Sequence, residues 1–271
     1  PLSTETGSKN VYQAAEMAEE SLMFYIKVAD LLVEIDNQYD VIEKKCRDYI
    51  VEPEREPDIR VRSTDEFLEA SLQTYHEDER ELYSMGEIES FCLHERIYPQ
   101  LPPFDAAWMH ACVVAVDDAA YAFTAPSGYG KTTQGLLWLD YFGSRARIIN
   151  GDNPIIRFTD GGCYVYGTPF GGSEGYQCNT RVPLKGICFL NRSNENSVTR
   201  MDSGMAFAQM MRTNEKFEFL FADNLEAMMT IWERIVEQIP FWQIYCNQSK
   251  EAVETAYRGM HARTAGRDSR K

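Results

Sequence analysis

A glycine-rich stretch near the middle of the chain, TAPSGYGKTTQ, has the residue types and spacing of a loop that holds a phosphate chain. Gly128 and Gly130 can adopt backbone conformations that turn N–H groups inward around phosphate oxygens. Lys131 can reach the β and γ phosphates of a nucleotide, and the Thr132 hydroxyl is a suitable ligand for Mg²⁺. The predicted phosphate-binding residues are Ser127, Gly128, Tyr129, Gly130, Lys131, Thr132 and Thr133.

This stretch follows the Walker A pattern G-x-x-x-x-G-K-[ST], with Ala125 in the first glycine position. An apolar run typical of a strand, AAYAFTA, precedes it, and a helical pattern over residues 132–142 follows it. The N-terminus of that helix adds a favourable dipole for an anion. A chance glycine turn before a helix is the alternative, and the strand–loop–helix order makes it the weaker interpretation.

The pattern of apolar runs predicts a mixed α/β core preceded by an α+β appendage. In the core we expect strands over residues 110–117, 119–125, 146–150, 154–158, 163–167, 182–190 and 241–246. We expect helices there over residues 132–142, 206–212, 224–238 and 251–260. Prolines at positions 99, 102 and 103 mark the boundary between the two parts. The predicted divisions are a flexible or helical segment 1–22, an α+β region 23–104, a nucleotide-binding core 105–260 and a loose basic tail 261–271.

Within the appendage, residues 24–35 are expected to contain a strand, and residues 59–63 a short second one. Residues 39–51, 64–84 and 86–101 have helical spacing, and Thr64 is a candidate N-cap.

Composition excludes some functions. The formal net charge is −15, so nucleic acid or an anionic membrane is a poor partner for the general surface. Seven cysteines without a CxxC pair indicate reduced, mostly buried thiols, and hence a cytoplasmic protein. The chain contains no apolar run of the roughly 20 residues that a membrane-spanning helix needs.

At four blocks the sequence resembles the HPr kinase/phosphorylase and phosphoenolpyruvate carboxykinase group, and particularly small HPr-kinase-like proteins. The blocks are SGYGKTT, then NGDNP where the family has NDDKP, and GTPFGGS with NTRVPLKGI where it has GTPW-x-GK and N-x-x-VPLKAI. The resemblance runs from about Trp108 to Leu190 and more weakly to Met260. It implies a P-loop core, ATP and Mg²⁺ as cofactors, and phosphoryl transfer to a hydroxyl group.

The resemblance also assigns roles to the acidic pair of NDDKP. Its first aspartate acts as base toward the acceptor, and its second helps to hold Mg²⁺. Here Gly151 stands in the first position and Asp152 in the second, so the implied metal ligands are Thr132 and Asp152. Asn153 and Ser173 stand where the family has lysines. Glycine cannot accept a proton, so another carboxylate would have to serve as base.

Three further residues are candidates for the site. Glu174 lies in a glycine-rich loop that can bring it over the γ phosphate, although a solvated loop carboxylate is the simpler interpretation. His110 precedes a predicted strand and contacts either phosphate or acceptor, or else is structural. Arg181 is the preferred phosphate-binding arginine. Surface exposure is the better interpretation of the other arginines considered, which are Arg145, Arg147, Arg157 and Arg192.

The sequence thus predicts an ATP- and Mg²⁺-dependent phosphotransferase with Lys131, Asp152, Glu174 and His110 as catalytic candidates. The acceptor is a hydroxyl group of a peptide, a protein serine or a small molecule. The alternative is a nucleotide-binding regulatory or scaffolding protein with little or no catalytic activity. With either function, the expected partners include a second copy of the chain or a partner protein. Carboxykinase activity and a GTPase switch are weaker interpretations, the latter because the chain has no NKxD motif.

Overall fold

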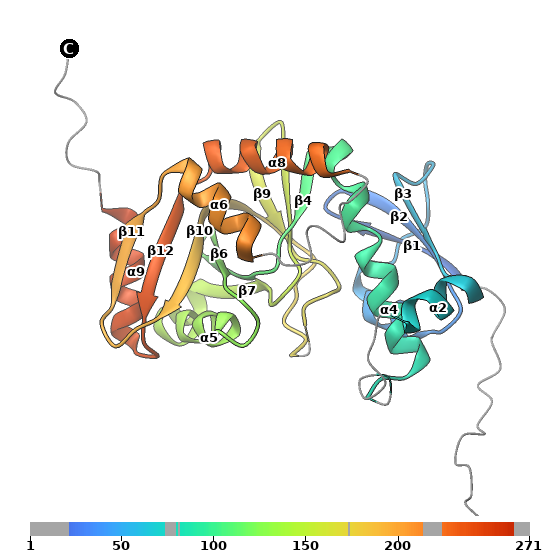
Figure 1. The fold of residues 1–271 in the computed structure, drawn as a ribbon, viewed down its shortest axis with the longest axis horizontal. Helices are drawn as coiled ribbons and strands as arrows, with labels where there is room; N and C mark the ends of the chain where they lie inside the picture. Colours follow the sequence, from blue (N-terminus) through green and yellow to red (C-terminus); the bar gives the residue numbers. More distant parts are fainter. Residues whose placement is uncertain (1–21, 74–79, 81, 173, 214–223, 263–271) are drawn as a thin grey trace, which may run out of the picture.

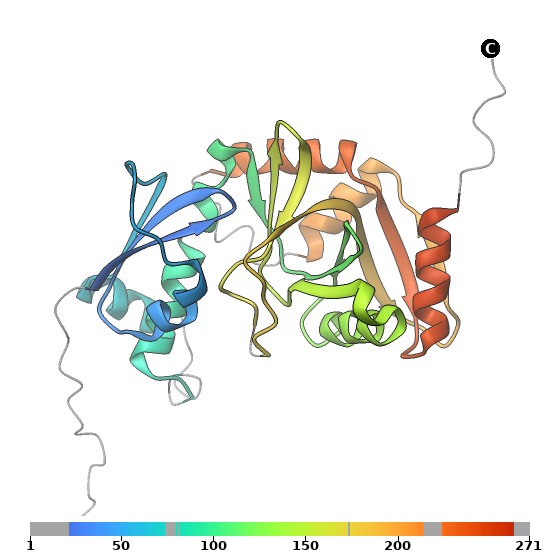
Figure 2. The same cartoon turned by 180° about the vertical axis from the view of Figure 1, so that it is seen from behind.

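The computed structural model describes residues 22–73, 80, 82–172, 174–213 and 224–262. These residues form a mixed α/β structure, as the sequence predicts. A three-stranded sheet with its helices lies at one end of the molecule, and a nine-stranded sheet makes up most of the remainder (Figures 1 and 2).

The smaller sheet has the order β1-β2-β3. Its strands are β1 (Leu22–Val28), β2 (Leu31–Asn37) and β3 (Ile59–Arg62). Three helices accompany it: α1 (Val41–Cys46), α2 (Asp65–Leu72) and α4 (Met85–Glu95). The predicted strand within residues 24–35 is in fact part of a hairpin of two antiparallel strands. Ala29 and Asp30 connect them with φ of 53° and 58°, which suits a two-residue hairpin turn.

Helix caps in this region follow from local sequence. The hydroxyl of Thr64 accepts a hydrogen bond from Phe67 N at 3.1 Å, which confirms the predicted N-cap of α2. Ser84 and Glu87 form a capping box at the start of α4.

The larger sheet has the order β4-β8-β9-β10-β6-β5-β7, and β12 pairs with β10 and β11. Its strands are β4 (Ala106–Trp108), β5 (Cys112–Val116), β6 (Ala119–Thr124), β7 (Ala146–Asn150), β8 (Ile155–Thr159), β9 (Gly162–Tyr166), β10 (Arg181–Arg192), β11 (Ser197–Arg200) and β12 (Phe241–Cys246). All seven strands predicted for the core are confirmed, whereas β4 and β11 were not predicted.

Strand directions in this sheet bring the ends of several strands to one edge. Strand β10 runs parallel to β6 and to β12. Strand β5 is antiparallel to both β6 and β7, so β7 runs in the same direction as β6. The carboxyl ends of β6, β7, β10 and β12 therefore meet at the same edge, where ligands bind in open α/β sheets.

Helices cover both faces of the larger sheet (Figure 1). They are α5 (Lys131–Phe142), α6 (Ser203–Thr213), α8 (Leu225–Gln238) and α9 (Lys250–His261). Trp138 of α5 and Val253 of α9 belong to one buried cluster, while Met210 of α6 and Trp232 of α8 belong to another. Short 3₁₀ turns complete the described structure at Arg47–Tyr49, Tyr98–Gln100, Pro102–Phe104 and Gly143–Arg145.

The two sheets share contacts. One buried apolar cluster extends from Ile26 in β1 to Phe241 in β12, and the ring of Tyr98 stacks on that of Trp108 at 4.8 Å. Arg157 of β8 donates a hydrogen bond to the carbonyl of Ala29.

The predicted division at residues 104–105 stays a prediction. The predicted segment 1–22, apart from its last residue, and nearly all of the predicted tail 261–271 lie outside the described residues. No helix in the described part of the chain is long and apolar enough to cross a membrane.

Candidate phosphate-binding site

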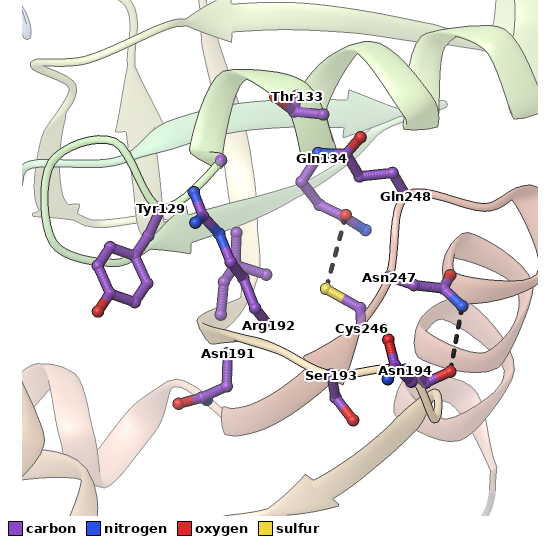
Figure 3. A pocket seen from close by; sticks show the side chains of 12 residues that line it. Tyr129, Thr133, Gln134, Asn191, Arg192, Ser193, Asn194, Cys246, Asn247 and Gln248 are labelled. Carbon is purple, nitrogen blue, oxygen red and sulfur yellow. Dashed lines mark hydrogen bonds between the residues drawn. The ribbon is translucent and has the colours of Figure 1, made fainter.

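The glycine-rich loop lies between the end of β6 and the start of α5, at the edge where the parallel strands end. Gly128 and Gly130 have φ of 73° and 97°, conformations that favour glycine. Ser127, Gly128 and Tyr129 are exposed. Figure 3 shows the Tyr129 side chain extending from the loop. The first N–H groups of α5 have no partner within the helix, so the loop presents backbone donors to an anion.

Lys131, the first residue of α5, is buried, and its Nζ donates a hydrogen bond to the carbonyl of Ala125 at 3.3 Å. Burial lowers the pKa of its ammonium group, while the nearby charge of Asp152 acts in the opposite direction. The lysine is therefore held folded back along the loop, beside the position where the phosphates are predicted to lie.

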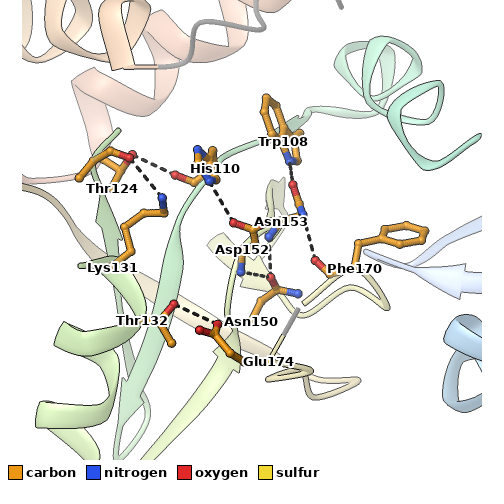
Figure 4. Close-up of polar contacts among 11 residues, drawn as sticks. Trp108, His110, Thr124, Lys131, Thr132, Asn150, Asp152, Asn153, Phe170 and Glu174 are labelled. Atoms are coloured by element: carbon orange, nitrogen blue, oxygen red, sulfur yellow. Dashed lines mark hydrogen bonds and ion pairs between the residues drawn. The ribbon is translucent and has the colours of Figure 1, made fainter. Parts of the chain in front are cut away.

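His110 and Asp152 form a pair next to Lys131 (Figure 4). His110 Nε2 lies 3.0 Å from Asp152 Oδ1, and both side chains are partly exposed. The strands fix this pair, because Ala111 N donates to the carbonyl of Asp152 at 2.9 Å and the Thr124 hydroxyl donates to the carbonyl of His110 at 3.0 Å. Two residues about forty positions apart thus meet at the start of β5 and just beyond β7.

Two asparagines orient the Asp152 carboxylate. Asn150 Oδ1 accepts hydrogen bonds from the backbone N–H groups of Asp152 and Asn153, at 2.9 and 2.7 Å. Asn153 Nδ2 donates to Asp152 Oδ2 at 2.9 Å, and Trp108 Nε1 donates to Asn153 Oδ1 at 2.9 Å. Asn153, which stands where the resemblance has a lysine, is therefore committed to holding Asp152 in place.

The ionisation of Asp152 reflects opposing effects. Burial alone would raise the pKa of its carboxyl, but the hydrogen bond and charge of His110, the charge of Lys131 and the Asn153 amide together hold that pKa below its usual value. The carboxylate is therefore ionised at neutral pH.

Gly151 lies where no side chain fits. A Cβ atom at this position would lie 2.7 Å from the carbonyl oxygen of Gly171 and 3.3 Å from Tyr176 Cβ. The backbone on both sides is fixed, because Gly151 N donates to Tyr176 O at 2.8 Å and Cys178 N donates to Ile149 O at 3.0 Å. The glycine is thus required by close packing of the glycine-rich loop against the end of β7.

The same packing brings Glu174 to the phosphate loop. The Thr132 hydroxyl donates a hydrogen bond to Glu174 Oε2 at 3.2 Å, and Figure 4 shows the two side chains directed toward each other. Gly172 and Gly175, on either side of Glu174, have φ of 82° and 67°. Ser173 lies outside the described residues. Three sequence candidates, Lys131, Asp152 and His110, thus lie together, with Thr132 and Glu174 beside them.

Arg181 does not join this group, which corrects its predicted role in binding phosphate. It begins β10, at the opposite end of the sheet from the phosphate loop, about 25 Å away at 3.3 Å per residue. Its guanidinium donates to Asp30 Oδ2 at 3.0 Å and to the Tyr166 hydroxyl at 3.1 Å. Arg181 thus contributes to the contact between the two sheets.

Arg192, at the other end of β10, is the arginine that lies at the loop. Its guanidinium donates to the carbonyl of Gly128 and lies 5.2 Å from the centre of the Tyr129 ring. The sequence favours surface exposure for Arg192, and its side chain is exposed, but it also contacts the loop. Its contact with the loop could not be predicted from the sequence, because it depends on β10 running parallel to β6.

The arrangement suits Mg²⁺ bound together with a nucleotide. Among the described residues no three His, Cys, Asp or Glu side chains form a metal-binding cluster. Mg²⁺ at phosphates normally takes only one or two protein carboxylates and keeps waters. A hydroxyl that ligates a metal through its oxygen can still donate its proton, so the hydrogen bond from Thr132 to Glu174 is compatible with a metal at Thr132.

Asp152→Asn is expected to lower the free energy of unfolding by about 1 kcal/mol at neutral pH, because a charge-assisted pair with His110 is lost. A carboxyl with a depressed folded-state pKa stabilises the fold above its unfolded value of 3.8, and this contribution is lost as pH falls through the lower folded-state pKa. In urea unfolding curves, the difference in free energy of unfolding between variant and wild type should therefore shrink below about pH 4.

The matched control is Asp160→Asn, which changes an exposed carboxylate in the β8–β9 turn and should leave stability at neutral pH near the wild-type value. If the loss of unfolding free energy in Asp152→Asn relative to wild type stayed constant between neutral and acidic pH, the assigned charge pairing would be contradicted.

Comparison with known proteins gives a limited result. No protein-family model matches the sequence, and no curated protein sequence matches it. Among solved structures, the chain is similar to the HPr(Ser) kinase/phosphatase from Coxiella burnetii, with a TM-score of 0.33 and 10% sequence identity. The match covers 56% of this chain and 94% of that chain. At this TM-score and identity, neither a function nor a residue role is transferred from that protein.

Proposed function

We propose that the protein is an ATP- and Mg²⁺-dependent phosphotransferase that acts on a hydroxyl group of a peptide, a protein or a small molecule. The observation that carries this proposal is the convergence of Lys131, the His110–Asp152 pair and the Thr132–Glu174 contact at the first turn of α5. A phosphate loop with a lysine, a hydroxyl and two carboxylates is the set of groups that phosphoryl transfer requires.

Each group has a role in the proposed reaction. The loop N–H groups and Lys131 bind the β and γ phosphates. Thr132 and Asp152 would hold Mg²⁺, which would neutralise charge on the phosphates. His110 and Asn153 orient Asp152 through the hydrogen bonds described above.

Glu174 takes the place of the missing aspartate as base. The acceptor oxygen forms a bond to the γ phosphorus, the bond from that phosphorus to the β,γ-bridging oxygen breaks, and ADP leaves. The acceptor proton passes to the Glu174 carboxylate. The position of this carboxylate beside Thr132 supports the assignment, because that hydroxyl marks the phosphate end of the loop.

Glu174→Gln is expected to reduce phosphoryl transfer or phosphate release from ATP about 10²-fold, because the amide cannot accept the proton. The affinity for ATP measured by calorimetry with Mg²⁺ should change no more than a few-fold, since the side chain keeps its shape. Glu195→Gln, an exposed carboxylate in the β10–β11 turn, is the matched control and should retain wild-type turnover. Turnover in Glu174→Gln equal to that of wild type would exclude Glu174 as the base.

A second candidate is a nucleotide-binding regulatory protein with little or no catalysis. The closed packing around Gly151 favours it, because no carboxylate can occupy that position without moving the neighbouring loop. Calorimetry with ATP and a non-hydrolysable analogue, followed by a turnover assay on the same sample, separates the two. Mg²⁺-dependent binding with transfer or phosphate release supports the kinase, whereas binding of both ligands without turnover supports the regulatory protein.

A further inference from the structure

A cavity of about 510 Å³ opens beside the phosphate loop (Figure 3). It lies between the loop, the first turn of α5 and the ends of β10 and β12. Its size falls within the range of about 300–1,000 Å³ that is typical of small-molecule sites. Its lining includes Tyr129, Thr133, Gln134, Asn191, Arg192 and Asn247.

The side chain of Gln134 leaves one polar group unsatisfied at this cavity. Gln134 is only 3% exposed, and its Oε1 lies 3.8 Å from Cys246 Sγ. Its Nε2 is buried and has no hydrogen-bond partner in the described structure. A buried donor without a partner is costly, so an acceptor atom of a ligand in the cavity would satisfy it.

The remaining lining has the chemistry of a nucleoside site. Five of the twelve lining residues carry side-chain amides, which offer both donors and acceptors to a base edge or to ribose hydroxyls. At the mouth, the guanidinium of Arg192 lies over the Tyr129 ring. A planar cation and an aromatic ring are both surfaces on which a base can stack.

The direction of the nucleotide across the loop follows from the two sides of α5. Lys131 and Thr132 face Asp152 and Glu174, which places the γ phosphate on that side. Thr133 and Gln134 face the cavity, which leaves the α phosphate and the nucleoside on the other side.

We infer that this cavity holds the base and ribose of the nucleotide, with Gln134 Nε2 donating a hydrogen bond to an acceptor atom of the base. The inference rests on the proposed function and deepens it. It makes the ligand a nucleoside triphosphate rather than a bare polyphosphate, and it assigns Gln134 as a specificity-determining residue.

The test compares ATP with inorganic tripolyphosphate, each with Mg²⁺, by calorimetry on the full chain. Wild type should bind ATP at least tenfold more tightly than tripolyphosphate. Gln134→Leu, which keeps the volume and removes the donor, should weaken ATP about tenfold and leave tripolyphosphate affinity within twofold. Gln243→Leu, on β12 but outside the cavity lining, is the control and should change neither affinity.

The outcomes separate this inference from the proposed function. Equal affinity of wild type for ATP and tripolyphosphate, or unchanged ATP affinity in Gln134→Leu, would overturn the inference and leave the phosphate site standing. Failure of wild type to bind either ligand would overturn the proposed function, and the inference with it. The wild-type comparison needs no variant, so poor folding of Gln134→Leu would not leave the question open.

Discussion

Lys131→Ala is expected to abolish the thermal stabilisation that ATP and Mg²⁺ give to the protein. The ammonium group of this lysine is predicted to reach the β and γ phosphates, and two charge-assisted hydrogen bonds are worth roughly 3–6 kcal/mol. Affinity should therefore fall about 10³-fold. At ATP concentrations near 100 times the wild-type dissociation constant, stabilisation of about 2.7 kcal/mol, or roughly 5–10 °C in melting temperature, should disappear.

The variant should fold in the absence of nucleotide. Burial lowers the pKa of Lys131, so the folded protein already disfavours its charged form, and removal of the side chain relieves that cost. Lys250→Ala removes an exposed lysine that pairs with Asp140 of α5 at 2.7 Å, and it should retain the full nucleotide-dependent shift. Thermal scans with and without ATP and Mg²⁺ measure both variants. If ATP and Mg²⁺ raised the melting temperature of Lys131→Ala as much as that of wild type, the assignment of this loop as the phosphate site would be wrong.

The core fold could be predicted where single segments carry their own signal. Strands β8 and β9 are two short apolar runs separated by the polar segment TDGG, and the structure pairs Thr159 with Gly162 across the turn between them. Strand β11 could not be predicted, because Ser197–Arg200 is largely exposed and becomes a strand only by pairing with β12. The hairpin of β1 and β2 was missed because its two-residue turn, Ala29–Asp30, contains no glycine or asparagine.

In the candidate site too, the sequence predicts local motifs but not the contacts that depend on strand pairing. Lys131 and Thr132 follow from a local motif, whereas the positions of arginines at opposite ends of one strand depend on sheet direction. Arg181 and Arg192 begin and end β10 and are about 35 Å apart along it. Only the parallel pairing of β10 with β6 decides which of them lies at the phosphate loop. The contact of His110 with Asp152 likewise depends on the pairing of β5 with β7.

Gly151→Asp, which restores the acidic pair expected from the family resemblance, is predicted to damage the protein rather than to activate it. The new Cβ would lie 2.7 Å from the carbonyl of Gly171, and that atom belongs to backbone that cannot rotate away. The loop of residues 171–176 would have to shift, with loss of the hydrogen bond from Gly151 N to Tyr176 O. Overpacking of this kind costs about 1–3 kcal/mol, and loss of the hydrogen bond adds about 1 kcal/mol.

The shift would also move Glu174 away from Thr132, so turnover should fall together with stability. Gly151→Ala separates the effect of the added Cβ from the effect of the added charge, because it introduces only the Cβ. Urea unfolding of this variant should show most of the destabilisation expected for Gly151→Asp. Gly204→Ala, near the start of α6 where a Cβ would lie 3.4 Å from its nearest neighbour, should be neutral or slightly stabilising. A Gly151→Asp protein with wild-type stability and increased turnover would show that this position accepts a catalytic carboxylate. The assignment of the base to Glu174 would then be wrong.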